Sequence, residues 1–236
     1  MNAKHLKFAL LSIVVAIAGS AHAAVSSANV LDVRYKSTAS GLTTQLYLPL
    51  SSQANNYGIG NYLFEMRDTQ SGVFAGSFIG YCVDLSQWAS SSFHIYETKL
   101  FDDSFARYGD VTKLFGHAYA DSLTNVTKAA GFQLALWEVF NDDGNLDSGL
   151  VRTTASTNVL VKSEAQSLLS SLSSWSDTGT AYQLTFYENA TYQNYLAVTG
   201  TGTGSVPSIP EADSYALLLA GLGLMGFVAR RRLRDL

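Results

Sequence analysis

Two side chains of complementary reactivity, a thiol and a primary amide, stand out in this sequence. Cys82 is the single cysteine among 236 residues, and it lies in the strand-like run 78–84. Gln133 lies within the apolar run 132–137, where an amide costs free energy unless its donors and acceptor are paired. A thiol buried beside an amide can attack the amide carbonyl and expel ammonia, which links the two side chains through a thioester. An incoming amine or hydroxyl could then take the acyl group, without turnover.

Each residue also has a simpler interpretation. A lone cysteine in an exported chain is intermolecular, reactive or buried, because such chains normally pair their cysteines. Cys82 could therefore be a buried structural thiol. Gln133 could be an amide that bonds to backbone groups. Trp137, by itself, could simply pack in the core.

The segment 125–140 is predicted to be the helix that positions Gln133. Its apolar residues recur at intervals of three and four, and Gln133 falls on the same stripe as Val126, Ala130, Trp137 and Phe140. The amide is thus expected on the buried side of the helix. The turn residues of 141–145 end the helix.

The remaining elements follow an order of strands, helices and strands. Helical spacing predicts further helices at 111–123 and 156–175, and the Gly/Ser/Asn cluster at 51–61 is interpreted as a loop. Strands are predicted at 29–35, 43–50, 61–67, 73–85, 92–101, 182–188 and 193–200. We therefore predict an α+β fold. Its strands form a sandwich or barrel-like sheet, with a helical segment inserted between the Cys82-bearing strand and the C-terminal strands.

Two short motifs carry a resemblance to a known family. Tyr81-Cys82-Val83-Asp84 and Gln133-Leu134-Ala135-Leu136-Trp137 resemble the two halves of the Cys–Gln thioester domain of bacterial surface adhesins. The resemblance covers residues 29–200, so we assign 24–200 to this domain. It implies that Cys82 and Gln133 form the bond and that Trp137 shields it, with Tyr81 and Asp84 in the surroundings.

The N-terminus is typical of a secretory signal peptide at residues 1–23. Lys4 and Lys7 precede the short apolar run 8–18, and Ala21-His22-Ala23 fits a cleavage site. The mature chain is therefore expected to begin at Ala24. An uncleaved membrane anchor is the alternative interpretation.

The C-terminus has the order of a sorting signal. A Gly/Ser/Thr linker at 201–209 precedes Pro210 and Glu211, and an apolar run follows at 215–229 before Arg230, Arg231 and Arg232. Residues 210–236 resemble the PEP-CTERM signal of Gram-negative bacteria, although Ala212 stands where that motif usually has its second proline. The resemblance implies processing by exosortase. Before processing, the apolar run would be a transmembrane helix in the cytoplasmic membrane, with the arginines on the cytoplasmic side. An ordinary anchor that is never processed is the alternative.

Composition narrows the choice of partners. Residues 24–205 contain nine Lys and Arg against sixteen Asp and Glu, a net charge of −7. Nucleic acid is therefore not expected as a partner, because phosphate binding requires a basic surface.

The sequence does not favour an enzyme or a metal-binding protein. A cysteine hydrolase needs a base, and the mature histidines His94 and His117 lie in no such signature. The acidic turn 141–147 resembles part of a calcium loop but lacks the downstream glutamate, so we interpret it as a helix C-terminus. We expect no catalytic turnover, no cofactor and no metal.

The sequence thus predicts an exported cell-surface or matrix protein that captures an amine or hydroxyl covalently, for adhesion or cross-linking. The alternative is a non-reactive structural protein of an exopolysaccharide or biofilm matrix.

Overall fold

The computed structural model describes residues 30–176 and 182–201. The predicted signal peptide at 1–23, and the linker and sorting signal from residue 202 onward, lie outside these ranges. Pro210, Glu211 and the three arginines therefore have no structural account here. None of the helices within the described ranges combines the length and the apolar character needed to cross a bilayer.

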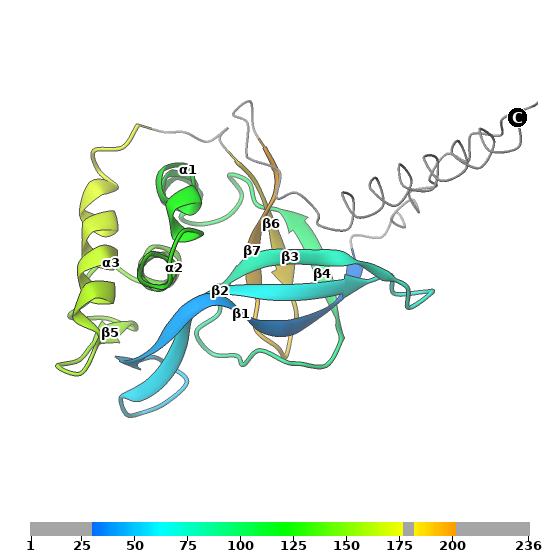
Figure 1. Cartoon of the computed structure of the whole chain (residues 1–236). Helices are drawn as coiled ribbons and strands as arrows, with labels where there is room; N and C mark the ends of the chain where they lie inside the picture. The colour runs from blue at the N-terminus through cyan, green and yellow to red at the C-terminus, as the bar shows by residue number, and fades with distance from the viewer. Residues whose placement is uncertain (1–29, 177–181, 202–236) are drawn as a thin grey trace, which may run out of the picture.

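Six strands close into an antiparallel barrel (Figure 1). They are β1 (Val30–Tyr47), β2 (Asn55–Arg67), β3 (Phe74–Cys82), β4 (His94–Leu100), β6 (Tyr182–Glu188) and β7 (Tyr195–Thr201). The sheet order is β2-β3-β7-β6-β4-β1, and a further pairing of β1 with β2 closes the ring. The two-residue strand β5 (Arg152–Thr153) pairs with the far end of β1.

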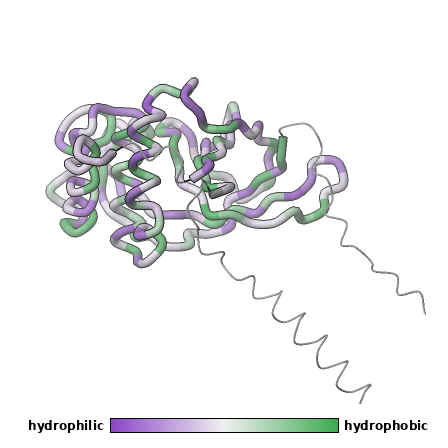
Figure 2. Tube along the Cα trace, turned by 90° about the horizontal axis from the view of Figure 1, so that it is seen from above, coloured by the Kyte–Doolittle hydropathy of each residue, from purple (hydrophilic) through white to green (hydrophobic). Residues whose placement is uncertain are grey.

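Three helices lie on one side of this barrel (Figure 1). They are α1 (Tyr108–Ser122), α2 (Val126–Asn141) and α3 (Val159–Ser171), which follow β4 and precede β6. The α+β prediction is confirmed, including the barrel-like strands and the helical insertion after the Cys82-bearing strand. Figure 2 shows the helices beside the barrel from above, with hydrophobic and hydrophilic residues mixed along both parts.

Helix α2 is the central element, because it contacts β1, β2 and β3 as well as α1 and α3. The Asn125 side chain caps its start by accepting a hydrogen bond of 3.0 Å from the Lys128 N–H. Every residue from Ala129 to Val139 is buried. A helix that is buried on all sides belongs in a core rather than on a surface, and here the buried residues include the polar side chains of Gln133 and Glu138. Val126, which we placed on the apolar stripe, is instead about half exposed at the first turn.

Two local predictions are wrong, and both concern β1 and β2. The strands expected at 29–35 and 43–50 are one continuous strand, β1, with irregular register between Tyr35 and Ser40. The loop expected at 51–61 ends at residue 54, because Asn55–Gly60 pairs with Gly41–Leu46 as the start of β2. The polar residues of both segments do not resemble a strand pattern. Strand preference depends strongly on packing in the folded protein, so residue type alone did not predict these two stretches.

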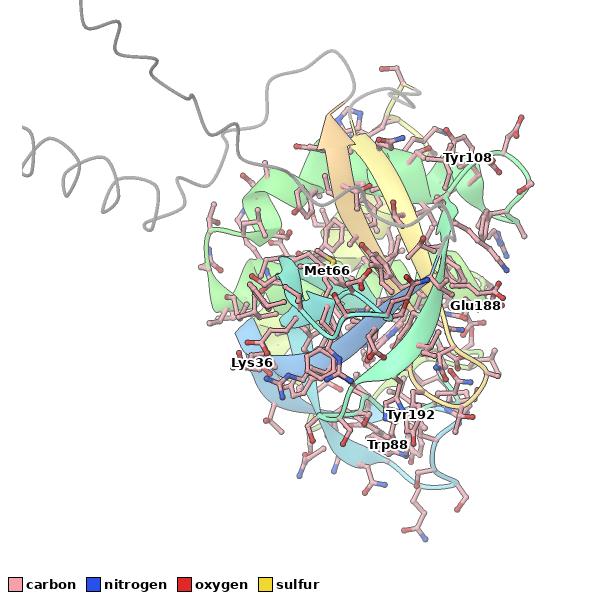
Figure 3. The ribbon with its side chains drawn as sticks, turned by 90° about the vertical axis from the view of Figure 1, so that its right-hand side faces the viewer. Lys36, Met66, Trp88, Tyr108, Glu188 and Tyr192 are labelled. Carbon is pink, nitrogen blue, oxygen red and sulfur yellow. The ribbon has the colours of Figure 1, made fainter. Side chains whose placement is uncertain are left out.

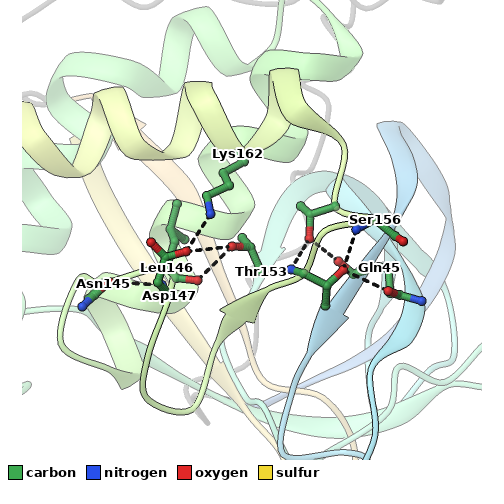
Figure 4. Close-up of polar contacts among 9 residues, drawn as sticks. Gln45, Asn145, Leu146, Asp147, Thr153, Ser156 and Lys162 are labelled. Carbon is green, nitrogen blue, oxygen red and sulfur yellow. Dashed lines mark hydrogen bonds and ion pairs between the residues drawn. The ribbon is translucent and has the colours of Figure 1, made fainter.

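The segment that joins α2 to α3 is tied to β1 and to α3 (Figure 4). The hydroxyl groups of Thr154 and Thr157 donate to Gln45, to its side-chain and main-chain oxygens at 2.9 and 2.6 Å. Lys162 of α3 reaches the Asp147 carboxylate at 2.6 Å. These bonds fix α3 against the end of the barrel. Helix α2 therefore lies between α3 and the barrel strands.

Candidate functional site

Cys82 is the last residue of β3, and it pairs in register with Tyr195 of β7. Its side chain is almost fully buried, with 8% of the residue exposed. Burial raises the pKa of the Cys82 thiol well above its ordinary value. Cys82 forms no disulfide within the described residues.

Gln133 projects from α2 onto the backbone of Cys82. Its Oε1 accepts a hydrogen bond of 3.0 Å from the Cys82 N–H, and its Nε2 donates one of 2.8 Å to the Cys82 carbonyl. The residue is fully buried, with 0% exposed. The cost of placing an amide in the core is therefore offset by two hydrogen bonds, and both are made to the residue that carries the sulfur.

This pairing has a chemical consequence for the Gln133 carbonyl. A nucleophile that adds to the carbonyl carbon pushes negative charge onto the oxygen, and the Cys82 N–H already points at that oxygen. Fixed donors of this kind stabilise a tetrahedral intermediate without further reorganisation. Holding the amide against the cysteine also converts the encounter of the two groups into an intramolecular event.

A cavity of about 210 Å³ opens beside the pair, and both Cys82 and Trp137 line it. Five aromatic residues contribute to its wall, which also contains Asp84 and Gln193. The aromatic residues are Tyr35, Tyr57, Tyr62, Trp88 and Trp137. The rings of Tyr57 and Trp88 stack with their centroids 6.1 Å apart. Figure 3 shows Trp88 near the same end of the barrel as Tyr192. The cavity thus gives a small nucleophile an approach to Cys82 between aromatic and polar side chains.

Three predicted neighbours of the pair occupy different positions. Trp137 lies one turn after Gln133, is 5% exposed and lines the cavity, with its indole N–H unpartnered among the described residues. Asp84 lines the cavity too, and its carboxylate accepts from the Ser86 N–H at 2.7 Å. Tyr81 is not a cavity residue: it packs on Phe132, with ring centroids 4.6 Å apart, and its hydroxyl bonds to Ser122 Oγ at 2.5 Å.

A second contact joins the two sequence motifs. The Asn141 side chain, at the end of α2, donates a hydrogen bond of 2.9 Å to the carbonyl of Val83. The helix is therefore held to the cysteine segment at both Gln133 and Asn141.

Gln193 was missed by the sequence analysis. It is a buried amide that lines the cavity, which Gln133 does not, and it is 5% exposed. Its Nε2 donates to the Asp84 carbonyl at 2.7 Å. No pattern around residue 193 distinguishes this glutamine from an exposed one, so its position depends on the tertiary structure.

His94 and His117 take part in other contacts. His94 stacks on Tyr192 and bonds to Ser90 Oγ at 2.8 Å, and His117 stacks on Trp175. Neither lines the cavity beside Cys82.

Comparisons with known proteins give a match at the C-terminus and similar solved folds. Residues 208–232 match the family described as the PEP-CTERM protein-sorting motif, which confirms the sorting signal predicted there. No curated protein matches the sequence.

Three solved structures that resemble the chain are N-terminal domains of bacterial proteins. One is the N-terminal domain of the Streptococcus pyogenes pilus tip adhesin Cpa, with 13% identity, a TM-score of 0.42, and coverage of 71% of this chain and 99% of that one. Another is the N-terminal thioester domain of a surface protein from Clostridium perfringens, with 13% identity, a TM-score of 0.40, and coverage of 68% and 100%. A third is the N-terminal thioester domain of a protein F2-like fibronectin-binding protein from Streptococcus pneumoniae, with 10% identity, a TM-score of 0.40, and coverage of 71% and 99%.

Proposed function

We propose that Cys82 and Gln133 form an internal thioester, with which the exported protein captures a nucleophile covalently. The Cys82 sulfur adds to the side-chain carbonyl carbon of Gln133. The carbon–nitrogen bond of the amide then breaks, and the thiol proton leaves with the nitrogen as part of ammonia. The product joins the Cys82 sulfur to the Gln133 acyl carbon.

In the capture step, the Cys82 sulfur is the leaving group. An amine adds to the same acyl carbon, the carbon–sulfur bond breaks, and the amine loses a proton to the departing sulfur. Gln133 ends as a substituted amide, or as an ester if a hydroxyl attacks, and Cys82 regains its thiol. Each protein molecule reacts once, so the process is stoichiometric and is not enzymatic turnover.

The observation that carries this proposal is the reciprocal pair of hydrogen bonds between the Gln133 amide and the Cys82 backbone. It fixes the electrophilic carbon beside the residue that bears the nucleophile and supplies an oxyanion donor. Gln193 lines the cavity together with Cys82, but its Nε2 donates to the main chain of Asp84 and Asn194. The contact with Cys82 therefore favours Gln133 over Gln193 as the reacting amide.

The PEP-CTERM sorting motif supports the proposal that the protein is exported. A chain with the motif at 208–232 would be anchored by its C-terminus, processed by exosortase and left on the cell surface or in the extracellular matrix. The captured acceptor would then be an amine or hydroxyl of a surface or matrix component, which gives covalent adhesion or cross-linking.

The test is the intact mass of the purified protein before and after exposure to methylamine near neutral pH. We expect the wild-type mass to be one ammonia below the calculated value and to rise by one methylamine after exposure. Peptide mapping should place the methylamide on Gln133. The Cys82→Ala and Gln133→Ala variants should lack both changes, whereas Gln193→Ala, a matched buried amide, should keep them.

Two outcomes would contradict the proposal. One is methylamine capture that survives in Cys82→Ala. The other is a folded wild-type protein at its plain calculated mass, with a thiol that can be alkylated after denaturation. The second outcome would leave the non-reactive matrix protein as the better interpretation.

A further inference from the structure

A cluster of carboxylates lies at the C-terminal end of α2, on residues that the thioester does not use. Carboxylate oxygens of Glu138, Asp142 and Asp143 all lie within 4.8 Å of one another. Two ligands on opposite sides of a Ca²⁺ ion lie about 4.6–5.2 Å apart, because each Ca–O bond is about 2.3–2.6 Å long. One ion can therefore contact all three carboxylates after small side-chain adjustments.

Glu138 is the residue that sets this cluster apart from an ordinary acidic turn. It is fully buried, with 0% exposed, and both carboxylate oxygens lack a hydrogen-bond partner among the described residues. A buried carboxylate is normally paired or bound to a metal, because an isolated one is very costly.

No side chain in the described ranges neutralises the cluster. The ion pairs formed by residues 30–176 and 182–201 include none of the three carboxylates. Arg107 lines the same cavity, but its guanidinium donates to the main-chain carbonyl of Asp142 at 2.9 Å. The described residues therefore give none of the three carboxylates an ion pair.

The cavity they share has room for an ion with bound water. It measures about 180 Å³, and Glu138, Asp142 and Asp143 line it together with Gly144. One water molecule occupies about 30 Å³ in the liquid. One oxygen of Asp142 is already held by the N–H groups of Leu150 and Val151. These bonds orient its carboxylate and leave the second oxygen available to an ion.

We propose that Glu138, Asp142 and Asp143 bind a calcium ion, which closes the turn 141–151 onto the end of α2. The ligands are hard oxygen donors, which favour Ca²⁺ or Mg²⁺ over transition metals. Ca²⁺ is favoured of the two because it accepts irregular geometry with several carboxylates, whereas Mg²⁺ demands a near-ideal octahedron. A calcium loop normally has its glutamate after the turn. Here Glu138, which lies before the turn in α2, takes that place.

This inference is independent of the proposed thioester, and thermal unfolding of the purified protein in Ca²⁺ or in EDTA tests it. We expect the unfolding temperature of wild-type protein to rise by about 5–10 °C at a Ca²⁺ concentration 100 times the Kd. Isothermal titration with Ca²⁺ should give one site per chain. Glu138→Gln keeps the shape of the side chain and removes the buried charge, so it should fold in EDTA and lose most of the Ca²⁺-dependent rise.

Two further variants keep the result interpretable if Glu138→Gln does not fold. Asp143→Asn changes an exposed ligand and should weaken the calcium response. Asp147→Asn removes an acid of the same turn that binds Lys162 and lies outside the cluster, so it should retain the full response. The proposal is overturned if wild-type protein shows no calcium response, if Asp143→Asn and Asp147→Asn respond equally to wild type, or if Mg²⁺ alone stabilises the protein.

Discussion

At the scale of single residues, the burial of the Gln133 amide depends on the residue that carries the thiol. Each group alone would be awkward in a core, and the Gln133 amide is satisfied only because the Cys82 backbone offers both an N–H and a carbonyl. The thiol is surrounded by aromatic side chains, and burial raises the pKa of Tyr62 and Tyr195, with Cys82 as the second cause in each case. A site this apolar would protect a thioester from water.

Trp137 is the residue whose removal should shorten the life of that bond. It lines the cavity with Cys82 and is 5% exposed, so Trp137→Ala would open a path for water and destabilise the fold by about 3–5 kcal/mol. We expect the thioester form of Trp137→Ala, followed by intact mass, to hydrolyse several times faster than that of wild type. Trp137→Phe should behave almost as wild type. Equal hydrolysis in Trp137→Ala and in Trp175→Ala, which alters a tryptophan stacked on His117, would show that the tryptophan does not shield the bond.

The sequence was sufficient to single out Cys82 and Gln133, because a lone thiol and an amide within an apolar run are both unusual. It could not identify Tyr57, Trp88 and Gln193 as parts of the cavity wall. They come from β2, from the segment between β3 and β4 and from the segment before β7, and only the closure of the barrel brings them together. Glu138 was missed as a member of the acidic cluster, since the turn was compared with a pattern that places its glutamate downstream.

At the scale of the elements, α2 carries both Gln133 and Glu138 of the acidic cluster, so its packing governs the position of both. Its closest neighbour is α3, which passes Gly131 near Glu164 and Ala165. A Cβ built at Gly131 would lie 2.6 Å from the Glu164 Cβ and 3.3 Å from the Ala165 nitrogen. The two helices can approach this closely only because residue 131 has no side chain.

Gly131→Ala should therefore be destabilising, although alanine is the better helix former. We expect a loss of about 1–3 kcal/mol in the free energy of unfolding, from forced separation of α2 and α3. Urea denaturation measures this value. Gly109→Ala, in α1, is the matched control: nothing lies within 4 Å of its added Cβ, so it should be neutral or stabilise by up to about 1 kcal/mol. A Gly131→Ala protein as stable as the Gly109→Ala protein would contradict this account of the packing.

Helices were easier to predict than the longest strands, for a physical reason. The helical period and the turn after residue 140 placed α2 to within a residue or two. For β1 and β2, the polar stretch around Ser40 and the glycines at 58 and 60 suggested a break and a loop. Their strand conformation comes from pairing across the barrel, where Gly41 lies opposite Gly60, and such pairing between distant backbones leaves little trace in local residue types.

At the scale of the whole molecule, barrel closure and the helical layer bury Cys82, and burial links its chemistry to stability. Because the pKa of the thiol is raised in the folded protein, the folded state holds its proton above pH 8.5, about where an unfolded thiol ionises. Above that pH the unfolded state binds fewer protons than the native state. The free energy of unfolding should then fall as pH rises, by up to about 1.4 kcal/mol per pH unit. Well below pH 8.5 the thiol is protonated in both states, so its contribution to the free energy of unfolding does not change with pH.

A protein with the thioester lacks that proton, so the pH dependence of stability reports the bond. We expect Gln133→Ala, which keeps a free thiol, to lose stability between pH 8.5 and 9.5, and Cys82→Ala/Gln133→Ala to lose much less. Wild type should follow the double variant, provided that mass measurement of the unfolded sample finds the bond intact. Buried tyrosines with raised pKa values also lower stability as pH rises, but all three proteins share them, so the difference between the proteins isolates the thiol. A wild-type protein whose denaturant midpoint falls with pH as steeply as that of Gln133→Ala would have a free thiol at Cys82, and covalent capture by this protein would then have no chemical basis.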